Sequence, residues 1–146
     1  MKKIELALHE DFSTVTELRN VIAEICRRLE FDKQDIYHIK SAVDEAFINI
    51  IQHSYKNKTG DVKIELDADD KKVTIRIMDW GEPLDKTHLR RSSLSDIINE
   101  QKEHGLGLLM IERLMDKVKY VRRKKTNTLI MVKRRKEKLH ERSRRT

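Results

Sequence analysis

The chain has 146 residues, 38% of them hydrophobic and 39% charged, with a formal net charge of +7 at pH 7. This length and balance predict one soluble domain with a single core. No apolar run approaches the roughly 20 residues of a membrane-spanning helix, and the N-terminus shows no signal-peptide core, so we expect a cytoplasmic protein with no membrane partner. The one cysteine, Cys26, excludes an internal disulfide, and its apolar neighbours predict a buried, unreactive thiol.

The net charge is concentrated at the C-terminal end. Residues 133–146 hold eight of the 32 lysines and arginines and two of the 25 acidic residues, which leaves them six of the seven net positive charges. We therefore predict a nearly neutral domain over residues 1–134 and a basic, disordered tail over residues 135–146. Such a tail could contact nucleic acid, an acidic partner or anionic lipid. It contains no Phe, Trp or Tyr that could stack on bases, which makes nucleic acid an unfavoured partner.

The first part of the chain predicts one strand followed by two helices. Apolar and polar residues alternate over residues 3–8, which is typical of a short edge strand. Ser13 or Thr14 can cap a first helix, whose apolar positions recur at helical spacing. Asp32 can cap a second helix, which we expect to run to about Tyr55.

Four further alternating segments predict an antiparallel sheet. Residues 62–66 and 73–77 form one pair of strands, joined by a predicted hairpin loop over residues 67–71. Residues 118–122 and 128–132 form a second pair near the end of the domain. Each segment keeps one apolar face, as a sheet covered by helices on one side requires.

The stretch between the two strand pairs contains a charged loop and a third helix. Residues 84–103 show no strand pattern and many charges. Gly105 and Gly107 then open a helix that reaches about Met115. The predicted order is strand, helix, helix, strand, strand, loop, helix, strand, strand, which indicates an α+β sandwich of two layers.

The second predicted helix carries a row of polar residues beside its apolar stripe. Glu45, Asn49 and His53 recur every four residues, so they lie along one edge of the helix. An asparagine oxygen suits Mg²⁺, which takes its other ligands from phosphates and water. A glutamate one turn away can accept a proton from an attacking hydroxyl. Taken alone, the row also fits the solvated face of an amphipathic helix.

Two short glycine motifs add to this row. Asp79-x-Gly81 stands at the end of a strand, where the carboxylate can accept a hydrogen bond from an exocyclic amine and glycine permits close backbone approach. Gly105-Leu106-Gly107 stands at a helix start, where backbone N–H groups favour phosphate. Each motif alone is also consistent with an ordinary turn. Neither a Walker A motif nor a Rossmann fingerprint is present.

The order and spacing of these motifs over roughly residues 4–134 resemble those of the GHKL (Bergerat-fold) ATPases. Within that superfamily the chain looks most like the anti-sigma factor serine kinases. The segments that carry this closer resemblance are Glu45 to His53, Asp79-x-Gly81-x-Pro83, Gly105-Leu106-Gly107-Leu108 with Met115-Asp116, and Asn127-Thr128-Leu129.

The resemblance implies a fold and a set of roles. The fold would be a two-layer Bergerat-type sandwich with a mixed, mostly antiparallel sheet, helices on one face, and a flexible ATP lid over about residues 84–104. Glu45 would be the general base for a serine hydroxyl, Asn49 would bind Mg²⁺, and Asp79 would read the adenine amino group of ATP. His53 would order the end of its helix. Further nucleotide contacts would come from Gly81, His104, Gly105, Leu106, Gly107, Leu108 and Thr128.

Two parts of the chain depart from the family pattern. Lys124-Lys125-Thr126 stands where relatives commonly place glycine before the last strand. The basic lid residues do not align with the arginine expected before the phosphate-binding glycines. Several basic lid residues could therefore neutralise the charge of the γ-phosphate. Each of them could instead belong to a run of solvent-exposed surface charges. These candidates are Arg90, Arg91, Lys102 and His104.

The activity that the resemblance implies is ATP-dependent serine kinase and anti-sigma factor. Such a protein would bind a sigma factor or another regulated target, phosphorylate an antagonist with a STAS domain, and form a homodimer. One alternative is a non-catalytic ATP-gated binding module of the same fold. A second is the catalytic domain of a two-component histidine kinase, for which the chain is too short to include a dimerisation domain. A third is DNA binding through the tail, which would depend steeply on salt.

Overall fold

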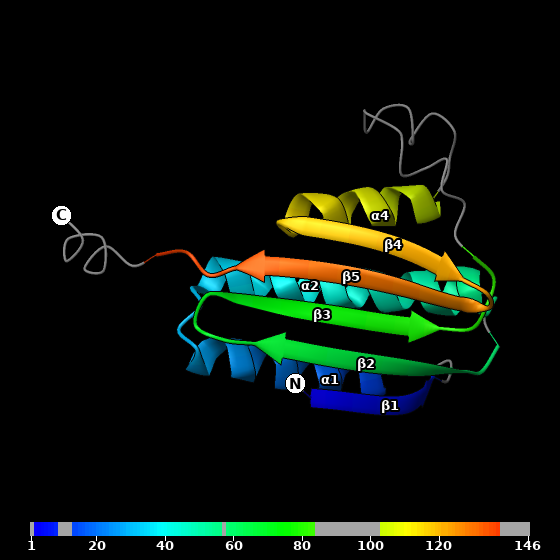
Figure 1. The fold of residues 1–146 in the computed structure, drawn as a ribbon, viewed down its shortest axis with the longest axis horizontal. Helices are drawn as coiled ribbons and strands as arrows, with labels where there is room; N and C mark the ends of the chain where they lie inside the picture. Colours follow the sequence, from blue (N-terminus) through cyan, green and yellow to red (C-terminus); the bar gives the residue numbers. More distant parts are fainter. Residues whose placement is uncertain (1, 9–12, 57, 84–102, 138–146) are drawn as a thin grey trace.

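The computed structural model describes residues 2–8, 13–56, 58–83 and 103–137, which form a sheet covered on one face by helices (Figure 1). The sheet has five strands in the order β1-β2-β3-β5-β4, and every pairing is antiparallel. The predicted α+β sandwich and its element order are confirmed. The elements are β1 (Lys2–Leu8), α1 (Ser13–Arg28), α2 (Lys33–Asn49), η1 (Ile50–Ser54), β2 (Gly60–Ala68), β3 (Lys72–Asp79), α4 (Glu103–Leu114), β4 (Lys117–Arg123) and β5 (Thr126–Arg134).

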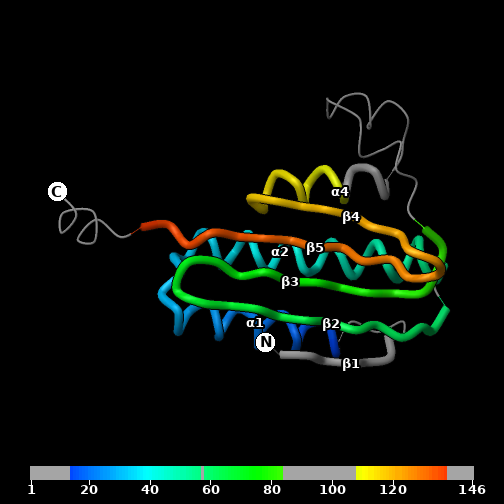
Figure 2. Tube along the Cα trace, in the orientation of Figure 1, coloured from blue at the N-terminus to red at the C-terminus, as the bar shows by residue number. Residues whose placement is uncertain are grey.

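The arrangement of the strands decides which residues meet at each end of the sheet. Figure 2 shows β5 between β3 and β4, running in the direction opposite to β3. The end of β3, the C-terminal end of α2 and the start of α4 therefore lie at one end of the molecule (Figure 1). The end of β5 lies at the other. In the described residues, no helix is long and apolar enough to cross a membrane.

The core lies between the sheet and the helices. Apolar residues at helical spacing on α1 and α2 face alternating apolar residues of β2, β3 and β5. Phe47 is among the largest fully buried side chains. Cys26 is also fully buried, and burial raises the pKa of its thiol to about 11. The thiol is therefore protonated at neutral pH, which confirms the prediction that Cys26 is a core residue.

The hairpin loop between β2 and β3 is shorter than the predicted loop over residues 67–71. β2 continues through Ala68, because Asp67 and Ala68 pair with Thr74 and Val73 of β3. The turn is closed by Asp69, whose carboxylate accepts the backbone N–H groups of Lys71 and Lys72 at 2.8 and 2.9 Å. These hydrogen bonds hold a three-residue turn, so the two residues before it are free to extend the ladder.

The second helix begins at the predicted cap. Asp32 has an extended backbone (φ −73°, ψ 164°), and its side chain accepts the backbone N–H of Asp35 at 2.7 Å. This hydrogen bond satisfies one of the N–H groups that the first turn of a helix leaves without an intrahelical acceptor.

Replacing Asp32 with alanine is expected to lower the free energy of unfolding by about 1 kcal/mol, because the capping hydrogen bond is lost. Urea denaturation followed by circular dichroism measures this change. Asp70→Ala, at an exposed turn position, is the matched control and should change stability by less than about 0.5 kcal/mol. An equal loss in both variants would contradict a specific cap.

The helical segment extends to Ser54, close to the predicted end at about Tyr55, but its last turn is not α-helical. The α-helix ends at Asn49, and Ile50–Ser54 forms a π-helix. Its closing hydrogen bond runs from the N–H of Tyr55 to the carbonyl of Ile50 at 2.9 Å, five residues back. The regular α-helical spacing that places Glu45 and Asn49 in one row therefore ends at Asn49. Single π turns of this kind are frequent at functional sites.

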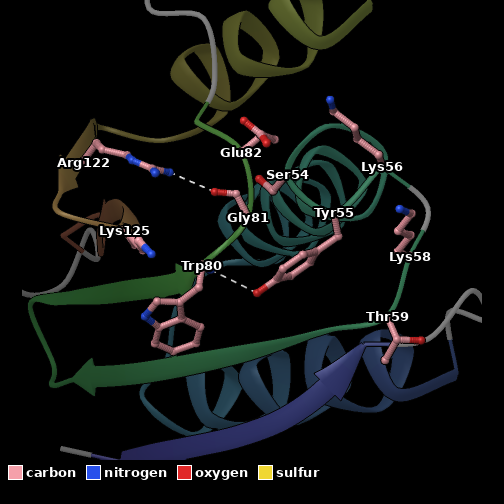
Figure 3. Close-up of a pocket in the computed structure, with 10 residues that line it drawn as sticks. All are labelled: Ser54, Tyr55, Lys56, Lys58, Thr59, Trp80, Gly81, Glu82, Arg122 and Lys125. Atoms are coloured by element: carbon pink, nitrogen blue, oxygen red, sulfur yellow. Dashed lines mark hydrogen bonds between the residues drawn. The ribbon is translucent and has the colours of Figure 1, made fainter.

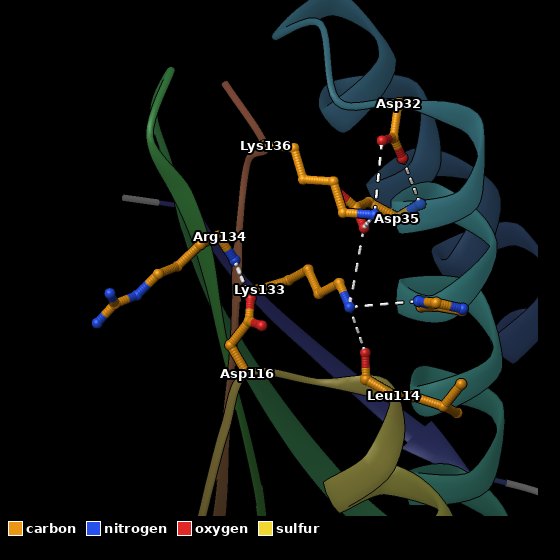
Figure 4. A network of polar contacts seen from close by, with 8 residues as sticks. Asp32, Asp35, Leu114, Asp116, Lys133, Arg134 and Lys136 are labelled. Atoms are coloured by element: carbon orange, nitrogen blue, oxygen red, sulfur yellow. Dashed lines mark hydrogen bonds and ion pairs between the residues drawn. The ribbon is translucent and has the colours of Figure 1, made fainter. Parts of the chain in front are cut away.

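Ion pairs with the buried Asp35 connect the end of β5 and the residues after it to the start of α2 (Figure 4). Lys133 projects from β5, and its Nζ donates to the carbonyl of Leu114 at 2.5 Å and lies 3.9 Å from Oδ1 of Asp35. The same Nζ lies 3.3 Å from Nδ1 of His38. Asp35 is 1% exposed, and its second ion-pair partner is Lys136 at 3.5 Å. A buried carboxylate and a largely buried ammonium thus compensate one another.

Residues on both sides of the predicted boundary after residue 134 contact the rest of the domain. Arg134 donates its backbone N–H to Oδ2 of Asp116 at 2.6 Å. Arg135 donates its backbone N–H to the carbonyl of Lys71 at 2.7 Å, and its Nε donates to the carbonyl of Asp70. The contacts of the chain with the domain therefore continue past residue 134. Residues 138–146 of the predicted disordered tail lie outside the described part, so disorder there stays a prediction.

Candidate functional site

The polar centre of the molecule joins the end of β3 and the start of β5. Asp79 and Asn127 are directly opposite one another in the antiparallel register. Nδ2 of Asn127 donates to Oδ1 of Asp79 at 2.8 Å, and the backbone N–H of Gly81 donates to the same oxygen at 3.0 Å. Asp79 is 4% exposed and Asn127 is fully buried. The carboxylate is therefore held in one orientation by partners from two strands.

Burial raises the pKa of Asp79 above its ordinary value. The hydrogen bonds from Asn127, Gly81 and Ser54 and the nearby charge of Arg122 act in the opposite direction, because they favour the carboxylate. An acceptor for an exocyclic amine has to be available as the carboxylate. The donors around Asp79 thus support the form that the predicted adenine contact needs.

Arg122 of β4 holds the surroundings of Asp79 in place. Its Nη1 donates to the carbonyl of Gly81 at 2.8 Å and to Oδ1 of Asn127 at 2.8 Å. One guanidinium thus orients the amide of Asn127, so that its Nδ2 faces Asp79. Charge-assisted hydrogen bonds of this kind are stronger than neutral ones.

Gly81 is required where the segment after β3 crosses the π-helix. A Cβ placed on Gly81 would lie 2.2 Å from the carbonyl oxygen of Ser54, far inside van der Waals contact. The next residue, Glu82, donates its backbone N–H to that same carbonyl at 2.7 Å. The close approach brings Ser54 within hydrogen-bonding reach of Asp79. The close approach at Gly81 is therefore to the backbone of the π-helix, and its predicted contact with the adenine ring stays a prediction.

Asn127 belongs to the segment Asn127-Thr128-Leu129 that carries the resemblance, but the sequence assigned it no role in the polar centre. Thr128, the predicted contact of this segment, pairs with Met78, and strand alternation directs it to the face opposite to Asn127. The identification of Asn127 required the register between β3 and β5. The sequence nevertheless contained a signal. Asn127, Leu129 and Met131 alternate along one face of the strand, and Asn127 is the polar residue among them.

Asn49 and Glu45 occupy successive turns at the C-terminal end of α2. Asn49 is 4% exposed, and among the described residues no hydrogen-bond partner is found for its Nδ2. A buried, unpartnered amide is costly in a folded protein unless a ligand satisfies it. Glu45 is half-buried, and its pKa is raised by burial and, to a smaller extent, by the neighbouring charge of Asp44. Asp44 itself pairs with Arg19 of α1 at 2.8 Å.

A magnesium site that depends on bound phosphate fits these residues better than a protein-only metal site. In the part of the chain that the structure describes, no three His, Cys, Asp or Glu side chains converge as a metal cage. Asn49 supplies one amide oxygen near a carboxylate, Glu45, on the same helix. Mg²⁺ commonly takes one or two protein oxygens and completes its octahedron with phosphates and water. The donor set present is therefore compatible with such an ion.

Helix α4 begins two residues before Gly105, slightly earlier than predicted. The helix begins at Glu103, so Gly105 belongs to the first turn and Gly107 to the second. The first-turn N–H groups have no acceptor within the helix, and they lie at the same end of the molecule as Asp79 (Figure 1). Leu108 is buried in the core, so a phosphate contact could use its backbone but not its side chain.

The structure does not describe the side chains of several predicted site residues. For His104 and Leu106 it describes only the backbone, which belongs to α4. Arg90, Arg91 and the remaining predicted lid positions through Lys102 lie outside the described residues. The roles assigned to these residues stay predictions.

Comparison with known proteins identifies the family. A family model described as a histidine kinase-like ATPase domain matches residues 8–133. The serine-protein kinase RsbW of Bacillus thuringiensis (strain Al Hakam) is 31% identical over 121 residues, covering 80% of this chain and 76% of the relative. RsbW of Bacillus cereus (strain ATCC 10987 / NRS 248) is 33% identical over the same length and coverage.

A solved structure supports the fold. The RsbU and RsbW domains of a Mycobacterium tuberculosis protein superpose with a TM-score of 0.61 at 19% identity. The match covers 94% of this chain and 34% of the longer one. The five-stranded sandwich of this chain agrees with that superposition. The chain belongs to the family of histidine kinase-like (GHKL) ATPase domains, in the group of the anti-sigma factor serine-protein kinases RsbW.

Proposed function

We propose that this chain is an ATP-dependent protein serine kinase that acts as an anti-sigma factor in a cytoplasmic partner-switching module. The observation that carries the proposal is the buried side chain of Asn49, one helical turn from the half-buried carboxylate of Glu45. Among the described residues, the amide Nδ2 of Asn49 has no hydrogen-bond partner. The similarity to serine-protein kinases RsbW supports the reaction class. The proposed substrate is a serine of a STAS-domain antagonist, and the proposed assembly is a homodimer bound to a sigma factor.

ATP would bind at the end of the sheet where the polar centre lies. The carboxylate of Asp79 would accept a hydrogen bond from the adenine amino group, held in place by Asn127 and Gly81. The N–H groups at the start of α4 would face phosphate oxygens. Asn49 would contribute an oxygen to Mg²⁺, which supplies charge neutralisation of the phosphates when bound.

Glu45 would serve as the general base. Its carboxylate takes the proton of the substrate serine hydroxyl as the serine oxygen bonds to the γ-phosphorus and the bond to ADP breaks. The raised pKa of Glu45 makes its carboxylate a stronger base than that of an ordinary glutamate. Phosphoserine then adds negative charge to the antagonist surface, which can release the antagonist from the kinase.

Magnesium-dependent ATP binding tests the site directly. Asn49→Ala and Asp79→Asn are each expected to weaken ATP binding by about tenfold or more, measured by calorimetry, because each removes a polar contact made in a buried site. Asn20→Ala and Asp70→Asn change the same residue types at exposed positions and should leave the dissociation constant unchanged. Absence of ATP binding by the wild type would overturn the site. Tight ATP binding without transfer to any candidate antagonist would favour the ATP-gated module.

A further inference from the structure

A second cavity lies beside the polar centre, on the outer side of Gly81 (Figure 3). Its volume is about 410 Å³, within the range of small-ligand pockets. Neither Glu45, Asn49 nor Asp79 lines it. The cavity is formed by the segment after the π-helix, the segment after β3, and the β4–β5 hairpin. The lining residues that carry charge or an aromatic ring at its mouth are Lys56, Lys58, Trp80, Glu82, Arg122 and Lys125.

The charge of this cavity is strongly positive. Four of its lining residues are lysine or arginine, and one, Glu82, is acidic. Arg122 is already occupied by the carbonyl of Gly81 and the amide of Asn127. The three lysines have no ion-pair or hydrogen-bond partner among the residues that the structure describes. Three uncompensated ammonium groups around one cavity favour a ligand that carries more than one negative charge.

The walls of the cavity are held by hydrogen bonds between segments distant in sequence. The hydroxyl of Tyr55 donates to the carbonyl of Asp61 at 2.6 Å and accepts the backbone N–H of Trp80 at 3.0 Å. The ring of Tyr55 lies against Gly60, where a Cβ would come within 2.3 Å of it. Trp80 is therefore positioned through its own backbone. A pre-formed frame lowers the entropy that a ligand would have to overcome on binding.

The indole of Trp80 gives the cavity an aromatic surface at its rim. Trp80 is 44% exposed, and it is the only tryptophan of the chain. An exposed indole next to several lysines can stack on a flat ring while the ammonium groups bind phosphate. Lys56, across the cavity, has a left-handed backbone (φ 52°) that ordinary residues adopt at a cost. Such strain is a recurrent property of ligand sites.

We propose that this cavity is a second anion site that binds a ligand bearing two or more phosphate charges. It adjoins the ATP site at Asp79 and shares the wall at Gly81 with it, but Glu45, Asn49 and Asp79 do not line it. Lys56, Lys58 and Lys125 bind the phosphate oxygens, and Trp80 covers the remainder of the ligand. Because the cavity shares neither Glu45 nor Asn49 with the proposed catalytic site, its occupancy does not depend on the kinase activity. The shared chemistry is that of an inorganic polyphosphate or a nucleotide.

The fluorescence of the single tryptophan tests the proposal in the full-length protein. Inorganic tripolyphosphate is titrated into the wild type and into Lys56→Gln/Lys58→Gln/Lys125→Gln, with calorimetry as a second readout. Arg122 stays unchanged because it supports Asp79. The matched control is Lys71→Gln/Lys72→Gln/Lys117→Gln, three exposed lysines at the opposite end of the sheet. Asn49→Ala separates this cavity from the ATP site.

The wild type, the control and Asn49→Ala are expected to bind tripolyphosphate alike, and the cavity variant about tenfold more weakly. A titration of GTP into the same four proteins distinguishes a nucleotide ligand from an inorganic polyphosphate. Binding tighter than that of tripolyphosphate indicates a nucleotide ring on Trp80, and equal binding indicates a non-aromatic polyphosphate. Failure of the wild type to bind either, or an equal loss in the cavity and control variants, would overturn the proposal. Loss in Asn49→Ala alone would assign the signal to the ATP site.

Discussion

Replacing Glu45 with glutamine is expected to lower the rate of phosphoryl transfer by about 10²–10⁴-fold, the usual contribution of a general base. Glutamine keeps the shape of the side chain but cannot accept the serine proton, so ATP affinity should change by no more than about twofold. Single-turnover transfer of ³²P from ATP to a candidate antagonist measures the rate, and calorimetry measures ATP binding. Glu17→Gln, at an exposed position of α1, is the matched control. Transfer at the wild-type rate in Glu45→Gln would exclude this residue as the base.

The same reaction should depend on pH through Glu45. Burial and the charge of Asp44 raise the pKa of Glu45, so protonation inactivates the base at a higher pH than for an ordinary glutamate. The transfer rate of the wild type is therefore expected to fall as the pH is lowered toward that raised pKa. Asp44→Asn removes the negative charge and frees Arg19, and both changes lower the pKa of Glu45. In Asp44→Asn the fall of the transfer rate at acidic pH should therefore occur at lower pH than in the wild type. A shift of this fall to higher pH would contradict the electrostatic account.

Replacing Lys133 with methionine is expected to lower the free energy of unfolding by about 3 kcal/mol. The change leaves the carboxylate of Asp35 buried without its partner on β5, and an uncompensated buried charge typically costs 3–5 kcal/mol. The lower end applies because Lys136 remains 3.5 Å from the same carboxylate. Urea denaturation of the wild type and variant gives the difference directly.

Two further variants test whether the effect comes from burial of charge. Lys136→Met removes a cation that is 57% exposed and should cost less than about 1 kcal/mol. The double variant Asp35→Leu/Lys133→Met removes both buried charges and should regain most of the stability lost in Lys133→Met. A double variant as unstable as the sum of its single changes would show that Asp35 and Lys133 act independently.

The order of the elements could be predicted because each is encoded by local patterns. Helical and alternating spacing of apolar residues predicted the helices and strands, and Asp32 provided a cap that the structure confirms. Glycine at position 81 was expected to allow close approach, and it meets the backbone of Ser54. These features depend on neighbours within a few residues in the sequence, or on the simple requirement for one apolar face.

The polar centre could be predicted in part. Asp79, Glu45 and Asn49 were assigned roles from their motifs. Asn127 was named in a motif segment but was assigned no role, because its contact with Asp79, 48 positions away, depends on the register of two strands. The π-helix after Asn49 was also missed. It arises where the end of α2 has to meet the segment around Gly81, a constraint that acts between elements rather than along one.

The sequence by itself determined the sandwich, its core stripes and the family of the site, since periodicity, caps and motif order are local properties of the chain. Only the tertiary structure decided which polar groups are buried together. The pairing of Lys133 with Asp35 and the orientation of Asn127 by Arg122 bring together residues from separate elements. The lysine-lined cavity beside Trp80 likewise combines three segments. Asp35, Lys133 and Asn127 are desolvated in the packed fold, an effect that no single segment experiences before the layers close.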